Sequence, residues 1–271
     1  MQAEAPSSDD RLARLRALRD LHRMLLARGV PVRGSEQLAQ SMALLFRDCL
    51  TNRKDKRRVP RAAELAHRLY DQAEQHAPPG APLACKAGCD YCCHAFVSLL
   101  APEAFLLAEK VSQRDGEGAD AMVETFKRRA QALRGLDQAA RLARDRLPCP
   151  LLEEHLCTVH PSRPLSCRKH ASFSVEPCMA AFGGEDALIP ANTEYLTLGT
   201  TCSVTLRAAL ASVAYSTALY ELSEAVSTIL DTENALQRWT EGEDVLAHVQ
   251  TDTTTPARFA PVIAALVSAI A

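Results

Sequence analysis

Cysteine is the residue type with the greatest potential for chemistry in this chain, which has ten cysteines in 271 residues. Eight of the ten lie between residues 85 and 178. A thiolate is a strong ligand for zinc and iron, and four thiolates satisfy one zinc ion or one [4Fe–4S] cluster. The candidate metal ligands are Cys85, Cys89, Cys92, Cys93, Cys149, Cys157, Cys167 and Cys178.

The first group of thiols lies in the run Cys85-Lys-Ala-Gly-Cys-Asp-Tyr-Cys-Cys-His94. Thiolates three and four residues apart on a tight loop with a glycine can converge on one centre. The adjacent Cys92 and Cys93 are expected to point in different directions, so that one of them faces a given centre. The CxxxCxxC spacing favours an iron–sulfur cluster, whereas zinc knuckles prefer CxxC; Cys89-x2-Cys92 leaves zinc open as the alternative.

Disulfides are the other explanation for clustered cysteines. Residues 1–10 are acidic and lack the basic and apolar regions of a secretory signal, so we expect a cytoplasmic protein. No apolar run reaches the roughly 18 residues of a membrane-spanning helix, so we expect no membrane partner. Reducing compartments disfavour disulfides, and a chain of this length does not need them to fold, so metal is favoured.

Charged and imidazole side chains lie close to the cysteines in the sequence. The cations could stabilise thiolates or could simply lie on a solvated loop; they are Lys86, Arg163, Arg168 and Lys169. The histidines could act as ligands or proton donors, although a lone histidine is more often a loop or core residue; they are His94, His155, His160 and His170. Cys49 and Cys202 lie on apolar helical stretches and are expected to be buried.

The pattern resembles the YkgJ-like family, which is named for a CxxCxxCC signature and described as zinc- or iron-chelating. The resemblance covers about residues 83–182, and it rests on residues 85–97, Cys149-Pro-Leu-Leu152 and the run from Cys157 to Arg168. The chain departs from the family in a first spacing of CxxxC and in His160, where tyrosine is commoner. Ser172 to Cys178 looks like the segment that supplies the family's last cysteine. Flagellin lysine N-methylase carries a related signature, so the resemblance implies metal chelation and leaves the substrate open.

A competing motif uses the same residues. Cys85-x3-Cys89-Asp-Tyr-Cys92 also matches the loop with which radical-SAM enzymes bind a [4Fe–4S] cluster, and Gly183-Gly-Glu185 imitates their GGE segment. Those enzymes need an alternating strand–helix barrel with a strand before the motif. Here Ala77-Pro-Pro-Gly-Ala-Pro82 precedes it, which argues against that class.

The periodicity of apolar residues predicts an all-α fold, a helical domain wrapped around an irregular cysteine-rich segment. We expect irregular structure over residues 147–189 and one candidate strand at 95–100. Helices are expected at 9–28, 35–50, 60–76, 101–113, 120–146, 193–230 (one helix or a pair), 231–236 and 256–270. Three regions follow: a basic helical arm (1–76), the cysteine-cluster region (83–182) and a C-terminal helical region (187–271).

Charge is distributed unevenly along the chain. Residues 1–70 carry 15 Lys and Arg against 8 Asp and Glu, and residues 176–271 carry 3 against 12. Aromatic residues do not interleave with the basic run 53–58, so nucleic acid is an unlikely partner and an unidentified protein is preferred.

Three hypotheses of function follow. The first is a metal-binding protein with an iron–sulfur cluster, or with zinc as the alternative, in a redox or accessory role. The second is a protein-modifying enzyme such as a protein lysine N-methylase. The third is a zinc-stabilised interaction module. The absence of a phosphate loop, nucleophile elbow or HExxH motif argues against nucleotide-binding enzymes and ordinary hydrolases.

Overall fold

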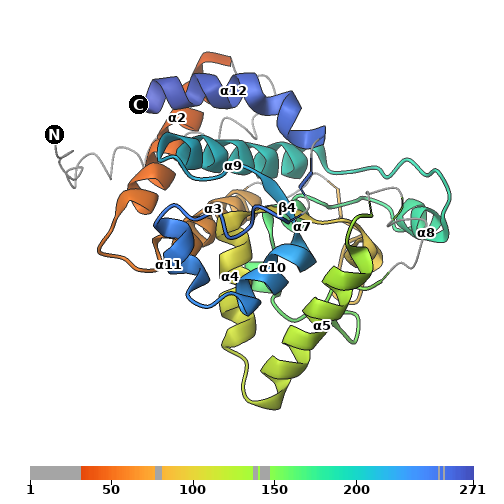
Figure 1. Ribbon diagram of the computed structural model, residues 1–271. Helices are drawn as coiled ribbons and strands as arrows, with labels where there is room; N and C mark the ends of the chain where they lie inside the picture. The colour runs from red at the N-terminus through yellow and green to blue at the C-terminus, as the bar shows by residue number, and fades with distance from the viewer. Residues whose placement is uncertain (1–31, 77–80, 137–139, 141–146, 250, 253) are drawn as a thin grey trace.

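The computed structural model describes residues 32–271 apart from 77–80, 137–139, 141–146, 250 and 253. The chain is predominantly helical with two small sheets, which confirms the all-α prediction (Figure 1). The expected helix at 9–28 lies outside the described residues. In the described part of the chain, no helix combines the length and the apolar character needed to cross a membrane.

Two long helices organise the fold. α9 (Thr193–Ser212) packs against α2 (Val32–Thr51), α3 (Arg58–His76) and α12 (Thr254–Ile270). α4 (Ala101–Ser112) packs against α3, α5 (Glu117–Leu133) and α10 (Leu222–Asp231). One apolar core extends from Leu38 to Val249, and a smaller one joins α2, α9 and α12 around Ala43 and Val204. Residues from all three predicted regions therefore contribute to the main core.

Two short antiparallel strands pair next to the helices α4 and α10. β1 (Ser98–Leu100), within the predicted strand at 95–100, pairs with β4 (Leu219–Glu221) so that Leu99 lies opposite Tyr220. Each strand runs directly into a helix, β1 into α4 and β4 into α10. The expected apolar stretch 193–230 is thus a pair of helices, α9 and α10, separated by a turn and β4.

Two predicted helices differ from the structure. The helix expected at 120–146 is interrupted after Leu133, because Arg134 leaves the helical conformation and Gly135 has a φ of 75°. The helix expected at 231–236 begins later, as α11 (Ala235–Thr240), because Asn234 adopts a left-handed conformation with a φ of 54°. Charge and apolar patterns do not mark such backbone reversals.

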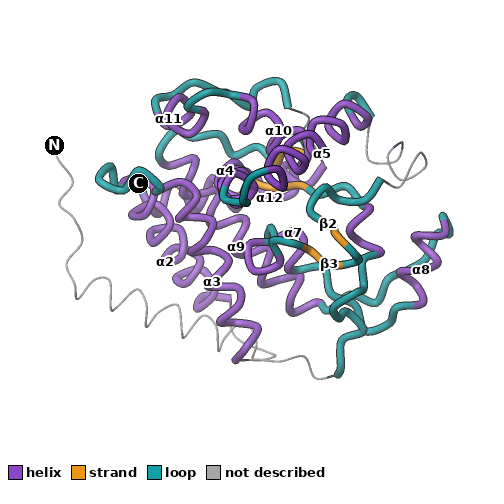
Figure 2. The backbone as a smooth tube through the Cα atoms, turned by 90° about the horizontal axis from the view of Figure 1, so that it is seen from below, coloured by secondary structure: helices purple, strands orange, loops and turns teal. Residues whose placement is uncertain are grey.

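The irregular region contains short elements. They are η1 (Tyr91–His94), β2 (Leu152–Glu153), β3 (Leu156–Cys157), η2 (His160–Ser162), α7 (Leu165–Arg168) and α8 (Glu176–Gly183). Figure 2 shows the loops around β2, β3 and α8 gathered on one side of the helical body. All eight candidate ligands lie in these short elements or in the loops between them.

Candidate metal centre

Three cysteine-bearing segments meet through backbone hydrogen bonds. The amide of Cys149 donates to the carbonyl of Cys93 at 2.8 Å, although 56 residues separate the two cysteines. The amide of Ala84 donates to the carbonyl of Ser172, also at 2.8 Å. Residues 84–94 therefore contact both the segment that starts at Cys149 and the one that leads to Cys178.

The first segment folds as a tight loop. Gly88 has a φ of 87°, a conformation that favours glycine, and the amide of Cys89 donates to the carbonyl of Lys86 at 3.0 Å. The amide of Cys93 donates to the carbonyl of Asp90 at 2.8 Å and begins η1. The chain thus turns between Cys85 and Cys89 and again before Cys93, as the glycine-containing loop predicted.

A hairpin brings Cys157 back toward Cys149. Strand β2 pairs with β3, so that Leu152 lies opposite Cys157, and the amide of Leu152 donates to the carbonyl of Cys149 at 2.9 Å. The two turn residues, Glu154 and His155, have φ values of 47° and 64°. Positive φ at both positions is the feature of a type I′ turn, the two-residue connection that matches the twist of paired strands.

Cys167 is held by α7, whose ends are fixed by two buried charged residues. At the N-terminal end, Glu103 of α4 accepts hydrogen bonds from the amides of Leu165 at 2.7 Å and Leu100 at 3.0 Å. His67 of α3 lies 3.2 Å from the same carboxylate. One buried carboxylate thereby connects α3, α4 and the segment of Cys167.

Arg168, next to Cys167, organises the loop before it. Its side chain is 1% exposed and pairs with Asp71 of α3. It donates from Nε to the carbonyl of Arg163 at 2.8 Å and from Nη2 to the carbonyl of Pro161. Its own carbonyl accepts from the hydroxyl of Tyr70 at 2.8 Å. The second arginine of the Arg-Pro-x-x-Cys-Arg run, Arg168, therefore has a structural role: it holds the loop before Cys167 against α3.

Cys178 reaches the first segment through α8. This helix packs against η1, and the Phe182 ring lies 4.9 Å from the His94 ring and 5.6 Å from the Tyr91 ring. Gly184 ends α8 in a left-handed conformation with a φ of 94°. The second glycine of the GGE run is therefore accounted for by its place at the end of a helix.

The electrostatic interactions between thiols define two groups. In an outer group, Cys85, Cys89 and Cys178 interact with one another and with Cys92. In an inner group, the thiols that interact are Cys93, Cys149, Cys157 and Cys167. Cys92 lies at the boundary, because it also interacts with Cys157 and Cys167. Cys92 therefore connects three outer thiols with four inner ones.

Cys92 and Cys93 correct one expectation. Their thiols hydrogen-bond to each other instead of pointing apart. The bond donated by Cys93 lowers the pKa of Cys92 to about 7, with a further contribution from Arg163, and the same bond raises the pKa of Cys93.

We expected nearby cations to lower the pKa of the cysteine thiols, but for most of the thiols burial has the larger effect and raises the pKa. Burial raises the pKa of Cys149 to about 11 and raises that of Cys167 well above its usual value. Arg163 acts to lower the pKa of Cys157, yet burial outweighs it. Metal binding to such thiols must therefore release protons.

The histidines make other contacts. The Asp90 carboxylate lies 2.9 Å from Nδ1 of His155 and 3.8 Å from Nε2 of His94. The guanidinium of Arg163 lies 2.8 Å from the His160 ring, and burial together with Arg163 lowers the pKa of that imidazole. His170 is exposed. Asp90 was missed by sequence reasoning, although its position inside the cysteine loop was a signal.

The side-chain positions themselves are not those of a closed metal site. Among the described residues, no three His, Cys, Asp or Glu side chains already converge as ligands of one ion. All ten cysteines lie in the described ranges, and all ten are free thiols. Cys202 is fully buried, as expected, whereas Cys49 is only half-buried and its thiol lies 3.5 Å from the carbonyl of Arg58. The argument for a metal therefore rests on the type of donor: eight thiols lie on short loops that contact one another.

Comparison with known families agrees with this chemistry. Residues 84–203 match the family CxxCxxCC, described as "Putative zinc- or iron-chelating domain". This part of the chain is thus similar to the CxxCxxCC family, in agreement with the resemblance seen in the sequence. The match supports metal chelation and does not distinguish zinc from iron. No curated protein and no solved structure matches the chain.

Proposed function

We propose that the cysteine cluster holds an iron–sulfur centre with a redox or accessory role. The observation that carries the proposal is the backbone hydrogen bond from the amide of Cys149 to the carbonyl of Cys93, because it joins two cysteine-bearing segments that lie far apart in the sequence. The donors are all thiols, and the first loop has the CxxxCxxC spacing that suits a cluster. When bound, an iron–sulfur cluster accepts and releases single electrons.

The residues around the thiols would tune such a centre. The amide of Ser172 donates to the sulfur of Cys85 at 3.3 Å. Hydrogen bonds to sulfur, together with the charge of Arg163 near Cys92 and Cys157, stabilise negative charge on the ligands. The exposed Cys85 and Cys92 lie where a partner could approach, whereas Cys167 is half-buried within α7.

Metal analysis of protein purified without oxygen tests the proposal. We expect iron and acid-labile sulfide in equal amounts, with broad charge-transfer absorption in the visible range that bleaches with dithionite. Stoichiometric zinc in a colourless protein would overturn the iron–sulfur assignment and keep the metal centre. Protein with neither metal would overturn both.

Eight thiols are enough for two centres of four ligands each, and single substitutions test this arrangement against one shared centre. Cys89→Ser removes an outer ligand and Cys157→Ser an inner one, and we expect each variant to retain about half of the metal. Cys202→Ser is the control, because Cys202 is buried in α9 outside the cluster. Complete loss of metal from either single variant would show one shared centre, and full retention in both would exclude these thiols as ligands.

The other hypotheses stay predictions with tests of their own. A protein lysine N-methylase must transfer methyl groups from S-adenosylmethionine to a protein substrate. An interaction module must retain its partner when zinc alone is bound.

A further inference from the structure

A large cleft lies on the opposite side of the molecule from the cysteines. It has a volume of about 1140 Å³, which is ample for a small organic ligand. Its walls come from the loop after α2, from α4 and from the segment that contains α10 and α11. In Figures 1 and 2, α11 and α8 lie at opposite ends of the molecule. No candidate metal ligand lines this cleft among the described residues.

The inner wall of the cleft is apolar. Leu50, Phe105 and Ile229 are 2%, 4% and 8% exposed, and their buried side chains form part of the lining. Leu230 and Leu236 are half-buried beside them. This wall can exclude water from an apolar ligand group, which is the main source of affinity for such groups.

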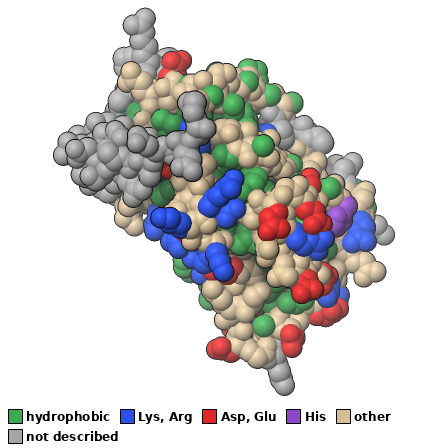
Figure 3. Space-filling view, turned by 60° about the vertical axis from the view of Figure 1, so that its left-hand side comes forward, with side chains coloured by type: hydrophobic (Ala, Val, Ile, Leu, Met, Phe, Trp, Pro, Cys, Tyr) green, Lys and Arg blue, Asp and Glu red, His purple; other side chains and the backbone are tan. Residues whose placement is uncertain are grey.

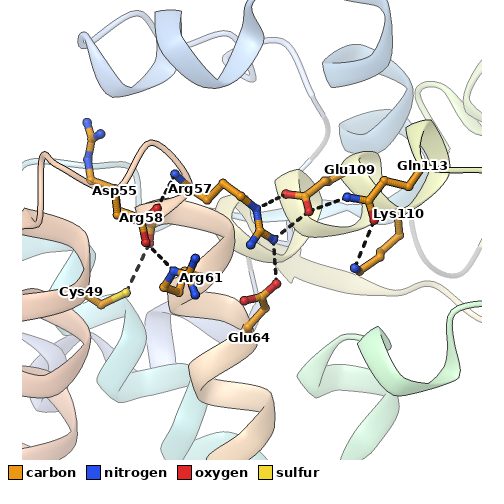
Figure 4. A network of polar contacts seen from close by, with 9 residues as sticks. All are labelled: Cys49, Asp55, Arg57, Arg58, Arg61, Glu64, Glu109, Lys110 and Gln113. Atoms are coloured by element: carbon orange, nitrogen blue, oxygen red, sulfur yellow. Dashed lines mark hydrogen bonds and ion pairs between the residues drawn. The ribbon is translucent and has the colours of Figure 1, made fainter.

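The outer edge carries cations on a loop that is firmly held. Arg57 binds Glu109 of α4 through two hydrogen bonds of 2.8 and 2.7 Å, and Glu64 of α3 through a third of 2.7 Å (Figure 4). Asp55 accepts from the amide of Arg57 and pairs with Arg61. The loop is therefore preorganised, which lowers the entropy cost of binding.

Three further cations on this loop line the cleft. Arg53 and Lys56 are exposed and Arg58 is half-buried, and no carboxylate of the described chain pairs with any of the three. Figure 3 shows Lys and Arg side chains gathered on this side of the molecule, with hydrophobic side chains between them. Two acids line the cleft: Glu109 is engaged by Arg57, and Glu241, at the end of α11, accepts a hydrogen bond from Nε2 of Gln237 at 2.9 Å. The edge thus offers positive charge next to an apolar wall.

We propose that this cleft binds an amphipathic organic anion, an acyl or alkyl chain that ends in a carboxylate or phosphate. The chain would lie against Leu50, Phe105 and Ile229, and the head group would meet Arg53, Lys56 and Arg58. A purely polar polyanion would leave the apolar wall unused, and a neutral lipid would leave the cations unpaired.

The chain contains its own reporter of binding. Trp239 is the single tryptophan. Its ring lies 4.5 Å from Tyr215 and 5.6 Å from Phe105, both of which line the cleft. Since Trp239 is itself 3% exposed, a ligand that displaces these rings changes its fluorescence without touching it.

Fluorescence titration of the full chain with dodecanoate, dodecyl phosphate and dodecanol tests the proposal. We expect saturable binding of at least one anion, and binding of dodecanol about tenfold weaker or more. Lys56→Ala and Arg53→Ala should each weaken anion binding about tenfold. Lys54→Ala is the matched control, because Lys54 is exposed on the same loop but does not line the cleft.

Three outcomes would overturn the proposal. They are no saturable signal with either anion, equal affinity for dodecanol, and equal losses in Lys54→Ala and Lys56→Ala. Thermal unfolding of each variant verifies that it is folded. The titration reads Trp239 and needs no metal, so its result is independent of the iron–sulfur proposal.

Discussion

Glu103 is the residue on which the placement of Cys167 depends most directly. It is 2% exposed, and its carboxylate accepts from two backbone amides and contacts His67. Burial alone would raise the pKa of Glu103, but the hydrogen bonds from His67 and the two amides together outweigh it and lower the pKa. The ionised form is therefore the one that the fold stabilises.

Replacing this carboxylate tests its role. We expect Glu103→Gln to lower the free energy of unfolding by about 2–4 kcal/mol, because an amide group cannot accept all of these hydrogen bonds. The contribution of Glu103 is fully present above the unfolded-state pKa of about 4.3 and is lost as the pH falls through the lower folded-state pKa. Urea unfolding at pH 7 and over the acidic range measures both effects.

An exposed carboxylate provides the comparison. Glu124→Gln on α5 should change the stability by less than about 0.5 kcal/mol, because Glu124 is exposed. If Glu103→Gln were as mild as Glu124→Gln, the buried carboxylate would not be what holds α7 to α4.

At the scale of elements, α9 supports the segment of Cys167 through a close contact. A Cβ placed on Gly199 would lie 2.6 Å from Cβ of Lys169, two residues after Cys167. Gly199 is buried in the middle of α9, and α7 packs against this helix. The glycine thus leaves room for the Lys169 side chain, which a Cβ at this position would displace.

Adding one methyl group at this contact has a predictable cost. We expect Gly199→Ala to destabilise the protein by about 1–3 kcal/mol, because overpacking outweighs the gain in helix propensity. Gly118→Ala is the matched variant in α5, where a Cβ would meet nothing within 4 Å, and it should stabilise by up to about 1 kcal/mol. Thermal unfolding distinguishes the two, and stabilisation by both would contradict the close contact.

At the scale of the whole molecule, the helical core and the cysteine loops depend on different interactions. The core from Leu38 to Val249 is held by apolar burial. Residues 84–94 and 147–183 contribute Leu151, Leu165 and Ala171 to it and otherwise form short elements around the thiols. Metal ligation would therefore stabilise the loops more than the helices.

Metal removal tests this division. Treatment with a chelator under reducing conditions should increase amide hydrogen exchange in residues 84–94 and 149–168 and leave α9 and α4 protected. Far-ultraviolet circular dichroism should retain most of its helical signal. Equal loss of protection in the loops and in α9 would show that the metal holds the entire fold.

Much of the molecule is encoded locally. Apolar periodicity predicted α2, α3, α4 and α12 within a few residues, and cysteine spacing predicted the metal-chelating family. These features could be predicted because amphipathic helices and ligand loops are specified by residues that are neighbours in the sequence.

Only the tertiary structure decided the rest. The break after Leu133, the contact between Cys93 and Cys149 and the burial of Glu103 depend on backbone reversals and on partners tens of residues away. The same holds for the cleft beside α11, where Arg53 and Phe105 come from distant segments. Sequence order therefore determined which side chains are available for chemistry, and packing in three dimensions decided which of them meet.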